Sequence, residues 1–435
     1  MIEYRNLRIA LLGAGSVGAQ VADQILQHGD ELAARVGAGI ELVGIAVRNP
    51  DSKRDAALPT HLITTDAETL VRNADIVIEL MGGIEPARSL ILTAINAGAD
   101  VITANKALLA HHGPEIFDAA AQVGAQVFYE AAVAGAIPII RPLRESLAGD
   151  RVHRILGIVN GTTNFILDRI DTLGESMKDA LAKATELGYA EADPTADIEG
   201  FDAAQKASIL ASLAFHTHVP VSAVHREGIT GVTLEQVQEA RKAGYVVKLL
   251  AIAERVIGDD GSEGISARVY PAMVPLEHPL AAVHGAYNAV FVEAEAAGSL
   301  MFYGAGAGGI QTASAVLGDL VSAARRHVIG GPGVAESTHA TFPILPISAI
   351  RTRYHVSLEI KDATGALAEI ASLFAKHGVS VETVEQKTAT DGSLTATLVI
   401  GTHEAIEADL AATVEALAAS PVVESVSGVL RVEGL

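Results

Sequence analysis

The first third of the chain alternates short apolar runs with longer amphipathic stretches. Apolar runs of strand length, about 10–25 residues apart, predict βαβ units, in which a parallel sheet is covered by helices on both faces. The predicted strands are Leu7–Leu12, Glu41–Val47, Ile76–Leu80, Asp100–Thr103 and Gln126–Tyr129. The pattern therefore predicts an α/β fold with a doubly wound sheet over residues 1–133.

The pattern changes in the middle of the chain. Val152–Val159 is typical of a strand, long helical patterns cover Thr163–Leu187 and Phe201–Phe215, and strand-like runs continue to Phe302. We expect an α+β domain over residues 134–304. A helix over residues 305–328 is expected to return to the first domain.

The last part of the chain has a compact pattern of its own. Residues 329–350 are rich in glycine and proline, lack periodicity and are predicted to be a linker. Residues 351–435 follow the order strand, helix, strand, strand, helix, strand, which is the ferredoxin-like βαββαβ arrangement. Asp391-Gly392 suits a tight hairpin turn with positive φ. The predicted elements are Tyr354–Lys361, Gly365–His377, Val379–Lys387, Leu394–Ile400, Glu404–Ala419 and Val422–Val432.

Composition narrows the functions that remain open. The 435 residues include no cysteine, which excludes disulfides, thiolate metal sites and a cysteine nucleophile. With 31 Lys+Arg against 52 Asp+Glu, the net charge of −21 argues against binding to nucleic acid or to an anionic membrane. The first residues do not resemble a secretory signal, and apolar stretches fall short of the ~20 residues of a membrane span. We therefore expect a cytoplasmic protein.

Three glycines mark a candidate nucleotide site. The run Gly13–Gly18 reads Gly-Ala-Gly-Ser-Val-Gly, follows the first predicted strand directly and opens the predicted helix Val17–Leu26. The alternative is an ordinary glycine turn, but a strand before and a helix after the motif favour a dinucleotide-binding (Rossmann) domain whose helix N-terminus faces the phosphates. The candidate cofactor contacts are Gly13, Gly15, Ser16, Val17 and Gly18.

The end of the second predicted strand bears on the choice of cofactor. An NAD-selective site usually places Asp or Glu there, to accept a hydrogen bond from the ribose 2′-hydroxyl. This chain has Arg48, whose guanidinium can hold a 2′-phosphate. The residue favours NADP and leaves NAD possible; a solvated loop arginine is the alternative interpretation.

Candidate catalytic residues occur in two regions. Asn105 and Lys106 lie at the carboxyl end of a predicted parallel strand, the edge where open α/β sheets bind ligands, so Lys106 points to the nicotinamide region. The alternative there is a helix-capping Asn followed by an exposed Lys. In the second region, Asp202 and Lys206 are spaced i,i+4 on a helix, which lets the aspartate hold an ammonium that donates a proton to a carbonyl oxygen. The alternative is a solvated surface ion pair, although the apolar run Ile209–Phe215 predicts burial of this helix.

Together these motifs resemble the homoserine dehydrogenase family, in its monofunctional bacterial form with a C-terminal ACT domain. The resemblance covers essentially the whole chain in the family's order, and it implies that the α+β domain over residues 134–304 binds the substrate and dimerises. One departure is Ala192, where the family typically has proline; this loosens the loop and leaves every functional position intact. The motifs are GAGSVG at Gly13–Gly18, ELMGG at Glu79–Gly83, TANK at Thr103–Lys106, EAAVAGAIP at Glu130–Pro138, VNGTTNFIL at Val159–Leu167, the block Glu191–Lys206 and GAGAGGIQTASAV at Gly304–Val316.

The resemblance implies reversible reduction of L-aspartate 4-semialdehyde to L-homoserine by NAD(P)H, a step in threonine, methionine and isoleucine synthesis. It implies that Lys206 is the general acid in reduction and that Lys106 polarises the carbonyl oxygen and contacts the nicotinamide. It also implies that Glu191 binds the substrate's amino group. Asp197 and Asp202 would orient the substrate and Lys206.

Two further sites follow from the resemblance alone. Gly308 and Gly309, in the run Gly304–Gly309, would make a second cofactor contact, for which the alternative is a plain flexible loop. A monovalent cation, Na+, would be coordinated mostly by backbone oxygens, which leave no side-chain signature in a sequence. The implied sodium ligands are Glu130, Val133, Gly135 and Ile137.

The C-terminal ACT domain suggests regulation. Asp362–Gly365 forms the first strand–helix turn, where such domains often bind an amino acid between subunits, so feedback by threonine is the natural hypothesis. A dimerisation module without ligand is the alternative, and the family suggests a homodimer or homotetramer. Two other functions stay open: another NAD(P)-linked amino-acid dehydrogenase, or an amino-acid sensor whose nucleotide domain no longer catalyses.

Overall fold

The computed structural model describes residues 5–54, 56–258, 261–330, 336, 338–388 and 395–434. The predicted turn Asp391-Gly392 and six residues of the predicted linker (331–335 and 337) lie outside these ranges. The chain divides into two compact units. The first comprises Met1–Gly161, Asp202–Ser222 and Ala286–Phe342; the second comprises Thr162–Phe201, Ala223–Gly285 and Pro343–Leu435. The domain boundaries expected from the sequence stay a prediction.

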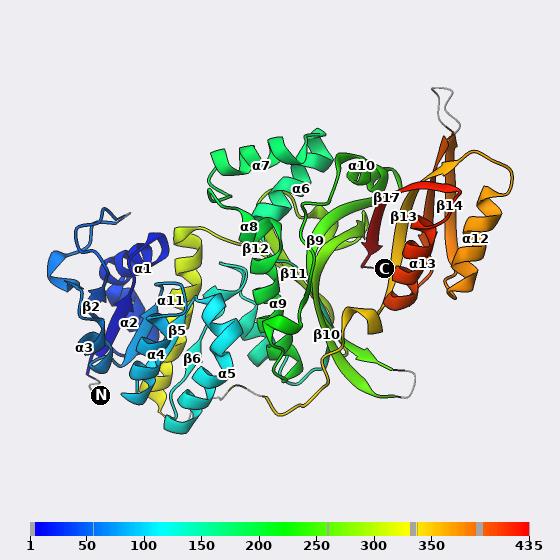
Figure 1. Ribbon diagram of the computed structural model, residues 1–435. Helices are drawn as coiled ribbons and strands as arrows, with labels where there is room; N and C mark the ends of the chain where they lie inside the picture. Colours follow the sequence, from blue (N-terminus) through cyan, green and yellow to red (C-terminus); the bar gives the residue numbers. More distant parts are fainter. Residues whose placement is uncertain are drawn as a thin grey trace. The chain divides into compact units, whose positions relative to one another are not determined.

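The first unit contains a six-stranded parallel sheet (Figure 1). Its strand order is β3-β2-β1-β4-β5-β6, so the order reverses between β1 and β4, the position where doubly wound sheets bind ligands. The five predicted strands are confirmed: β1 and β5 have the predicted bounds, and the other three differ by one residue at one or both ends. The added strand β3 is too short to leave a pattern. The elements are β1 (Leu7–Leu12), α1 (Ser16–Gln27), α2 (Gly29–Val36), β2 (Ile40–Ala46), β3 (Ile63–Thr64), α3 (Ala67–Arg72), β4 (Ile76–Glu79), α4 (Ala87–Asn96), β5 (Asp100–Thr103), α5 (Lys106–Val123) and β6 (Val127–Phe128).

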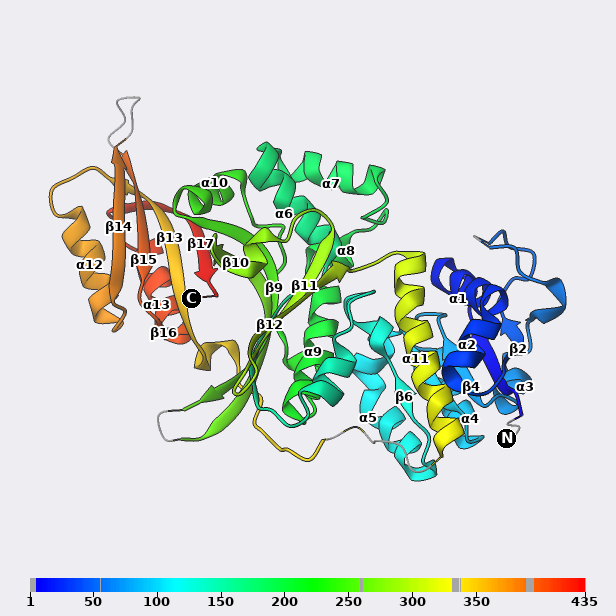
Figure 2. The same ribbon diagram turned by 180° about the vertical axis from the view of Figure 1, so that it is seen from behind.

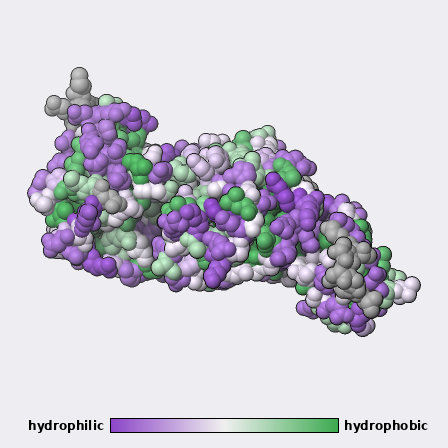
Figure 3. Space-filling view, turned by 90° about the horizontal axis from the view of Figure 1, so that it is seen from above, coloured by the Kyte–Doolittle hydropathy of each residue, from purple (hydrophilic) through white to green (hydrophobic). Residues whose placement is uncertain are grey.

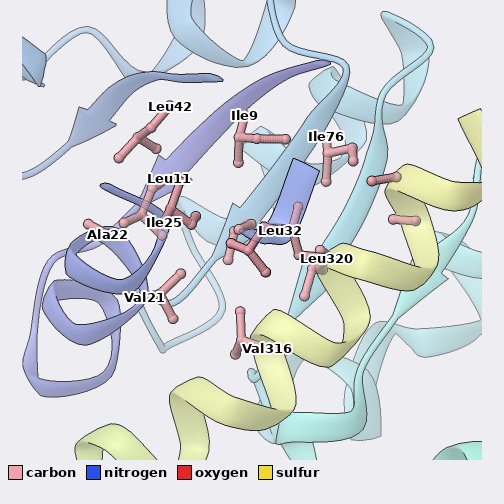
Figure 4. Close-up of a cluster of buried hydrophobic side chains, with 14 of the residues drawn as sticks. Ile9, Leu11, Val21, Ala22, Ile25, Leu32, Leu42, Ile76, Val316 and Leu320 are labelled. Atoms are coloured by element: carbon pink, nitrogen blue, oxygen red, sulfur yellow. The ribbon is translucent and has the colours of Figure 1, made fainter. Parts of the chain in front are cut away.

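Helices cover both faces of this sheet. The connections β1–β2 and β4–β5 run in opposite directions along the sheet, and because such crossovers are right-handed, α1 and α4 lie on opposite faces. On the α1 face, Ile9, Leu11 and Val21 pack with Val316 and Leu320 of a helix from much later in the chain, α11 (Gly309–Ile329) (Figure 4). The core beneath the nucleotide turn is thus completed by a distant segment.

The first unit also contains three antiparallel strands and one buried helix. β11 pairs with β12 on one side and with β7 on the other. The helix α9 buries twelve of its fifteen residues, which explains its nearly continuous apolar sequence. The bounds are β7 (Val152–Ile158), α9 (Phe201–Phe215), β11 (Tyr287–Ala294) and β12 (Gly298–Ala305).

The second unit contains a mixed sheet that runs into the C-terminal βαββαβ domain. β9 and β10 form a long antiparallel pair, β10 pairs in parallel with β17, and β17 continues through β13 and β15 to β14. The helices α12 and α13 lie side by side on one face of the C-terminal strands (Figure 2). The elements are α6 (Gly161–Leu173), α7 (Met177–Glu186), α8 (Thr195–Ile198), β8 (His225–Arg226), α10 (Leu234–Lys242), β9 (Tyr245–Ile257), β10 (Glu263–Pro275), β13 (Arg351–Lys361), α12 (Ala366–Lys376), β14 (Val381–Thr388), β15 (Thr395–Thr402), β16 (Ala405–Ile406), α13 (Glu407–Ala418) and β17 (Val423–Val432).

The structure corrects one helical prediction. The pattern over Thr163–Leu187 forms two helices, because Gly174 adopts φ +66° and ends α6. Ser176 then caps α7 by accepting a hydrogen bond from the N–H of Asp179. Helical periodicity continued across the break, so the sequence pattern concealed it.

The surface in one view is largely hydrophilic. On the face shown in Figure 3, hydrophilic residues are spread widely, with hydrophobic residues in small groups among them. Within the described ranges, no helix combines the length and the hydropathy that crossing a bilayer would need.

Candidate active site

The glycine turn after β1 has the geometry that a dinucleotide needs. Gly13 adopts φ +95°, and a Cβ there would lie 2.7 Å from the carbonyl oxygen of Leu80 on the neighbouring connection. A Cβ on Gly18 would lie 2.2 Å from the oxygen of Gly13, so this glycine allows the helix to approach the strand. Gly15 caps α1 with open space around its Cα, which leaves the first N–H groups of the helix, from Ser16 onward, available to a phosphate.

A second glycine turn meets the first. Gly308 adopts φ +123° and caps α11, and a Cβ on Gly309 would lie 3.0 Å from the carbonyl oxygen of Ser16. The N-termini of α1 and α11 therefore lie together. Gly308 and Gly309 are brought to the nucleotide turn, whereas the sequence separates them from it by almost three hundred residues.

Arg48 lies two residues beyond the end of β2 and is exposed. Its position at the carboxyl edge of the sheet is the one from which a cofactor's ribose is contacted. Among the described residues, no carboxylate forms an ion pair with this guanidinium, so a phosphate would not need to displace a carboxylate.

The motifs ELMGG and TANK are tied together at the carboxyl ends of β4 and β5. The buried carboxylate of Glu79 accepts hydrogen bonds from the N–H of Met81 (2.8 Å) and from the hydroxyl of Thr103 (2.6 Å). Asn105 caps α5 by accepting from the N–H of Leu108 at 3.1 Å, and its amide donates to the oxygen of Gly83 at 2.6 Å. In this structure the Asn105 side chain fixes the turn that begins α5.

Asp202 brings the two candidate lysines together. Its carboxylate forms an ion pair with Lys106, the first residue of α5, and accepts from the Lys206 ammonium at 2.7 Å. The predicted i,i+4 pair between Asp202 and Lys206 is therefore confirmed. Asn160 donates to the same carboxylate at 2.9 Å, and Lys206 also donates to the oxygen of Val159 at 2.6 Å.

The cluster combines one buried and one accessible cation. The Lys106 side chain is 42% exposed, whereas those of Lys206 and Asp202 are 10% and 6% exposed. Burial alone would raise the pKa of Asp202, but the charges of Lys206 and Lys106 outweigh it and hold that pKa well below its usual range. The carboxylate therefore stays ionised and keeps the ammonium of Lys206 in a fixed position.

Asn160 was not among the residues predicted from the sequence, although it lies in the motif Val159–Leu167. The signal that could have found it is its place two residues after β7, where a polar residue follows a largely buried strand. Asn160 is 6% exposed, and its amide donates a hydrogen bond to the Asp202 carboxylate that the two lysines share.

The remaining predicted substrate residues belong to the second unit. Asp197 lies in the short helix α8, and Glu191 lies in the loop before it. Asp193 starts this helix by accepting from the N–H of Thr195 at 3.1 Å and from its hydroxyl at 2.6 Å, which lowers the pKa of Asp193. The helix gives Asp197 a defined backbone position.

The loop predicted to bind sodium is buried and folded back on itself. The carboxylate of Glu130 accepts from the N–H groups of Ile139, Ile140 and Arg141 at 2.6–3.0 Å, so it is engaged within the protein. Ala134 and the following glycine adopt φ +59° and +58°, which turns the backbone sharply.

The carbonyl oxygens of this loop fit a hard monovalent cation. Outside regular helices and strands, no described backbone N–H donates to the oxygens of the four predicted ligands, Glu130, Val133, Gly135 and Ile137, although all four residues are buried. Buried carbonyl groups without such donors can coordinate a cation or accept a hydrogen bond from water. The described residues contain no cluster of three or more His, Asp or Glu side chains that would hold a metal, so a site here would be made of backbone oxygens.

A buried acid supports the same loop. Asp319 of α11 accepts from the N–H of Glu130 at 2.9 Å and from Arg141 at 3.2 Å. Burial raises the pKa of Asp319 to about 7, although Arg141 opposes this. A Cβ on Gly135 would lie 2.4 Å from the oxygen of Gly306, so the loop also contacts the second glycine turn directly.

Comparison with known proteins identifies the family. The family model for the NAD-binding domain of homoserine dehydrogenase matches residues 13–130, that for homoserine dehydrogenase matches residues 138–321, and that for the ACT domain matches residues 354–421. The chain thus contains an NAD(P)-binding domain and an ACT domain.

Relatives match over the full length. The homoserine dehydrogenase of Corynebacterium glutamicum is 52% identical over 98% of this chain and 95% of its own, and that of Mycobacterium tuberculosis H37Rv is 53% identical over 99% of both. The crystal structure of a homoserine dehydrogenase from Thiobacillus denitrificans matches with a TM-score of 0.92 and 40% identity, over 100% of this chain and 99% of that one. The chain belongs to the homoserine dehydrogenase family.

Proposed function

We propose that this chain catalyses the reversible NAD(P)H-dependent reduction of L-aspartate 4-semialdehyde to L-homoserine, a step in threonine, methionine and isoleucine synthesis. The observation that carries the proposal is the Lys106–Asp202–Lys206 cluster, in which a buried carboxylate holds one lysine and pairs with a second. Family membership supports the choice of substrate.

Lys206 is the proton donor in this proposal. When bound, the dihydronicotinamide supplies the hydride that the aldehyde carbon accepts. The new alkoxide oxygen takes a proton from the ammonium of Lys206. Solvent supplies a new proton to Lys206 after each turnover. Asp202 and the oxygen of Val159 fix the direction of this ammonium, so its position is set before substrate arrives.

Lys106 polarises the same carbonyl in this mechanism. Its ammonium is accessible and positively charged, and it is anchored at one end by Asp202. A cation near the carbonyl oxygen stabilises the negative charge that develops there. In the reverse direction, neutral Lys206 accepts the hydroxyl proton of homoserine.

The amino-acid end of the substrate is assigned to the loop Glu191–Phe201, called the substrate loop below. Glu191 binds the substrate's ammonium group, and Asp197 orients the substrate from α8. Both assignments rest on the family resemblance and on the residue types, since an anionic side chain is the natural partner of an ammonium.

The cofactor is assigned to the two glycine turns. Gly13, Gly15, Ser16, Val17 and Gly18 hold the pyrophosphate, and Gly308 and Gly309 complete the site from α11. Arg48 selects NADP by pairing with its 2′-phosphate, and NAD remains a usable alternative. Asn105 and Lys106 contact the nicotinamide end. The carbonyl oxygens of the Glu130–Ile137 loop hold Na+, which fixes this loop against the second glycine turn.

The ACT domain is assigned a regulatory role. Asp362–Gly365 joins β13 to α12, and Gly365 adopts φ +93° there, which opens the turn at the start of the helix. Threonine binds at this turn and inhibits the enzyme, which assembles as a homodimer or homotetramer.

The test is a steady-state assay of the full chain with L-aspartate 4-semialdehyde, using NADPH and NADH in turn, with and without threonine. The proposal predicts turnover with NADPH, weaker turnover with NADH, and inhibition by threonine. Absence of turnover with both cofactors would overturn the enzymatic assignment. If NADPH and NADH are used equally well, the role given to Arg48 is wrong. Indifference of both activity and assembly to threonine would refute only the regulatory part.

A further inference from the structure

A segment of the second unit that includes Arg226 supports the end of the substrate loop. Arg226, the last residue of β8, donates from its guanidinium to the carbonyl oxygen of Glu199. The same guanidinium lies 3.5 Å from the centre of the Phe201 ring, which is cation–π distance. Both contacts immediately precede Asp202 in the chain, so Arg226 holds the loop where it enters α9.

Backbone packing strengthens this support. A Cβ on Gly228 would lie 2.3 Å from the oxygen of Ile198 and 2.6 Å from the Cα of Glu199, so the two backbones are in direct contact. The N–H of Ile229 donates to the same Ile198 oxygen at 2.7 Å. Residues Arg226–Ile229, called the supporting segment below, therefore cannot shift without moving α8, which carries Asp197.

The supporting segment is itself held by the C-terminal domain. Glu227 accepts from the Nη1 of Arg431 on β17 at 2.9 Å, and from His225 at 2.7 Å. Burial opposes ionisation of Glu227, but His225 and Arg431 outweigh it and lower the pKa of Glu227 to about 2. The ion pair is therefore formed throughout the neutral range.

Arg431 is fixed at its other side by the ACT domain. Its Nε and Nη2 donate to Glu407, the first residue of α13, at 2.8 and 2.5 Å. Tyr354 of β13 donates to the same carboxylate at 2.7 Å. The Arg431 guanidinium also lies 4.5 Å from the centre of the Tyr270 ring of β10. One arginine thus joins the ACT sheet, an ACT helix and the supporting segment.

We infer that Arg226 and Glu227 are positioning residues for the substrate loop, and that Arg431 couples this position to the ACT domain. An amino acid bound to the ACT domain would shift α13 or β17, and the shift would reach α8 through the Arg431–Glu227 ion pair. The inference rests on the proposed function, because it takes the loop as the substrate's amino-acid subsite.

Thermodynamic linkage makes the coupling reciprocal. If the effector weakens substrate binding by a given factor, the substrate weakens effector binding by the same factor; such factors are commonly about 5–150. The effector acts only if its affinity differs between two positions of the loop. Breaking the Arg431–Glu227 ion pair should therefore reduce the effect of the effector on substrate binding and the effect of the substrate on effector binding by the same factor.

The variant to test is Glu227→Gln in the full chain. It keeps the shape of the side chain and leaves Arg431 paired with Glu407, so folding is preserved. Arg351→Gln is the matched control for Arg431→Gln, because it makes the same chemical change in the C-terminal domain and breaks only the exposed pair between Arg351 and Glu404. Arg431→Gln and the double variant complete a double-mutant cycle. Hydrogen–deuterium exchange of residues 195–201, with and without threonine, is the primary readout, and the KM for aspartate semialdehyde is the second.

The expected result in Glu227→Gln is faster exchange at residues 195–201 and a KM raised ~3- to 10-fold, with the effect of threonine on both reduced towards none. Arg351→Gln should match the wild type, and the double variant should add little to the larger single effect. Unchanged exchange at 195–201, or additive effects in the cycle, would overturn the inference. If the wild type shows no turnover, the proposed function fails, while the exchange result still decides the inference.

Discussion

The replacement Asp202→Asn removes one negative charge from between two lysines and changes little in shape. The Lys206 ammonium lies 2.7 Å from this carboxylate, and both side chains are buried. Breaking a buried pair costs ~3–5 kcal/mol of folding free energy. The 42% exposure of Lys106 means that its pair with Asp202 is screened by water and adds little to this sum.

The larger effect of Asp202→Asn should fall on catalysis. General acid catalysis contributes a rate enhancement of ~10²- to 10⁴-fold. A misplaced proton donor loses much of this enhancement, so we expect kcat to fall ~10²-fold or more. Losing the carboxylate also removes the attraction that favours the ammonium form of the donor. In the reduction direction, the alkaline limb of the pH–rate profile should therefore move to lower pH.

The assay is the pH dependence of NADPH oxidation with saturating aspartate semialdehyde, together with NADPH binding by fluorescence titration. Binding of NADPH should be unchanged. Asp66→Asn is the matched control: it makes the same chemical change at the exposed cap of α3, where asparagine also caps well. A variant with wild-type kcat and an unmoved pH profile would show that Asp202 does not hold the proton donor.

Three further predictions concern other parts of the chain. Gly15→Ala should fold normally and lose cofactor affinity, because a Cβ there contacts nothing until pyrophosphate binds. Gly13→Ala should instead be destabilised in the free protein, because its Cβ would clash with the Leu80 carbonyl. Equal melting temperatures of these two variants would contradict this. Burial lowers the pKa of Lys248 to about 8 from its ordinary 10.5, so the unfolded chain binds more protons between these values. The stability of the wild type relative to Lys248→Met should therefore rise by ~3 kcal/mol from pH 8 to pH 10.5 in urea titrations, and a constant difference would refute it. Gly135→Ala should displace the loop predicted to bind sodium and abolish the dependence of the melting temperature on Na+, whereas Gly149→Ala, which has open space, should keep it.

The sequence predicted those parts of the site that depend on local spacing. The turn Gly13–Gly18 was recognisable because its glycines, the strand before it and the helix after it are neighbours in the chain. The pair of Asp202 and Lys206 followed from i,i+4 geometry. Lys106 was identified by its place at a strand end, but its contact with Asp202 depends on how α5 and α9 pack, which spacing does not contain.

Long-range polar contacts explain what the sequence could not predict. Asn160 reaches Asp202 from after β7, and nothing local marks it as a partner of a lysine pair. In the sequence, Arg431 has no feature that distinguishes it from other strand residues. Only the pairing of β17 with β13 and β10 places it between the carboxylates of Glu227 and Glu407. The same reasoning covers Gly309, whose approach to Ser16 depends on the return of α11 to the nucleotide sheet.

The proposed reaction is direct hydride transfer to an aldehyde with Lys206 as the proton donor. The most direct measurement uses NADPH carrying deuterium at both C4 positions of the dihydronicotinamide, with L-aspartate 4-semialdehyde as substrate, and detects the product by mass spectrometry. The wild type should form L-homoserine with one deuterium on its hydroxyl-bearing carbon, and Lys206→Met should form almost none over the same period. Homoserine without deuterium, or equal product from Lys206→Met, would contradict it.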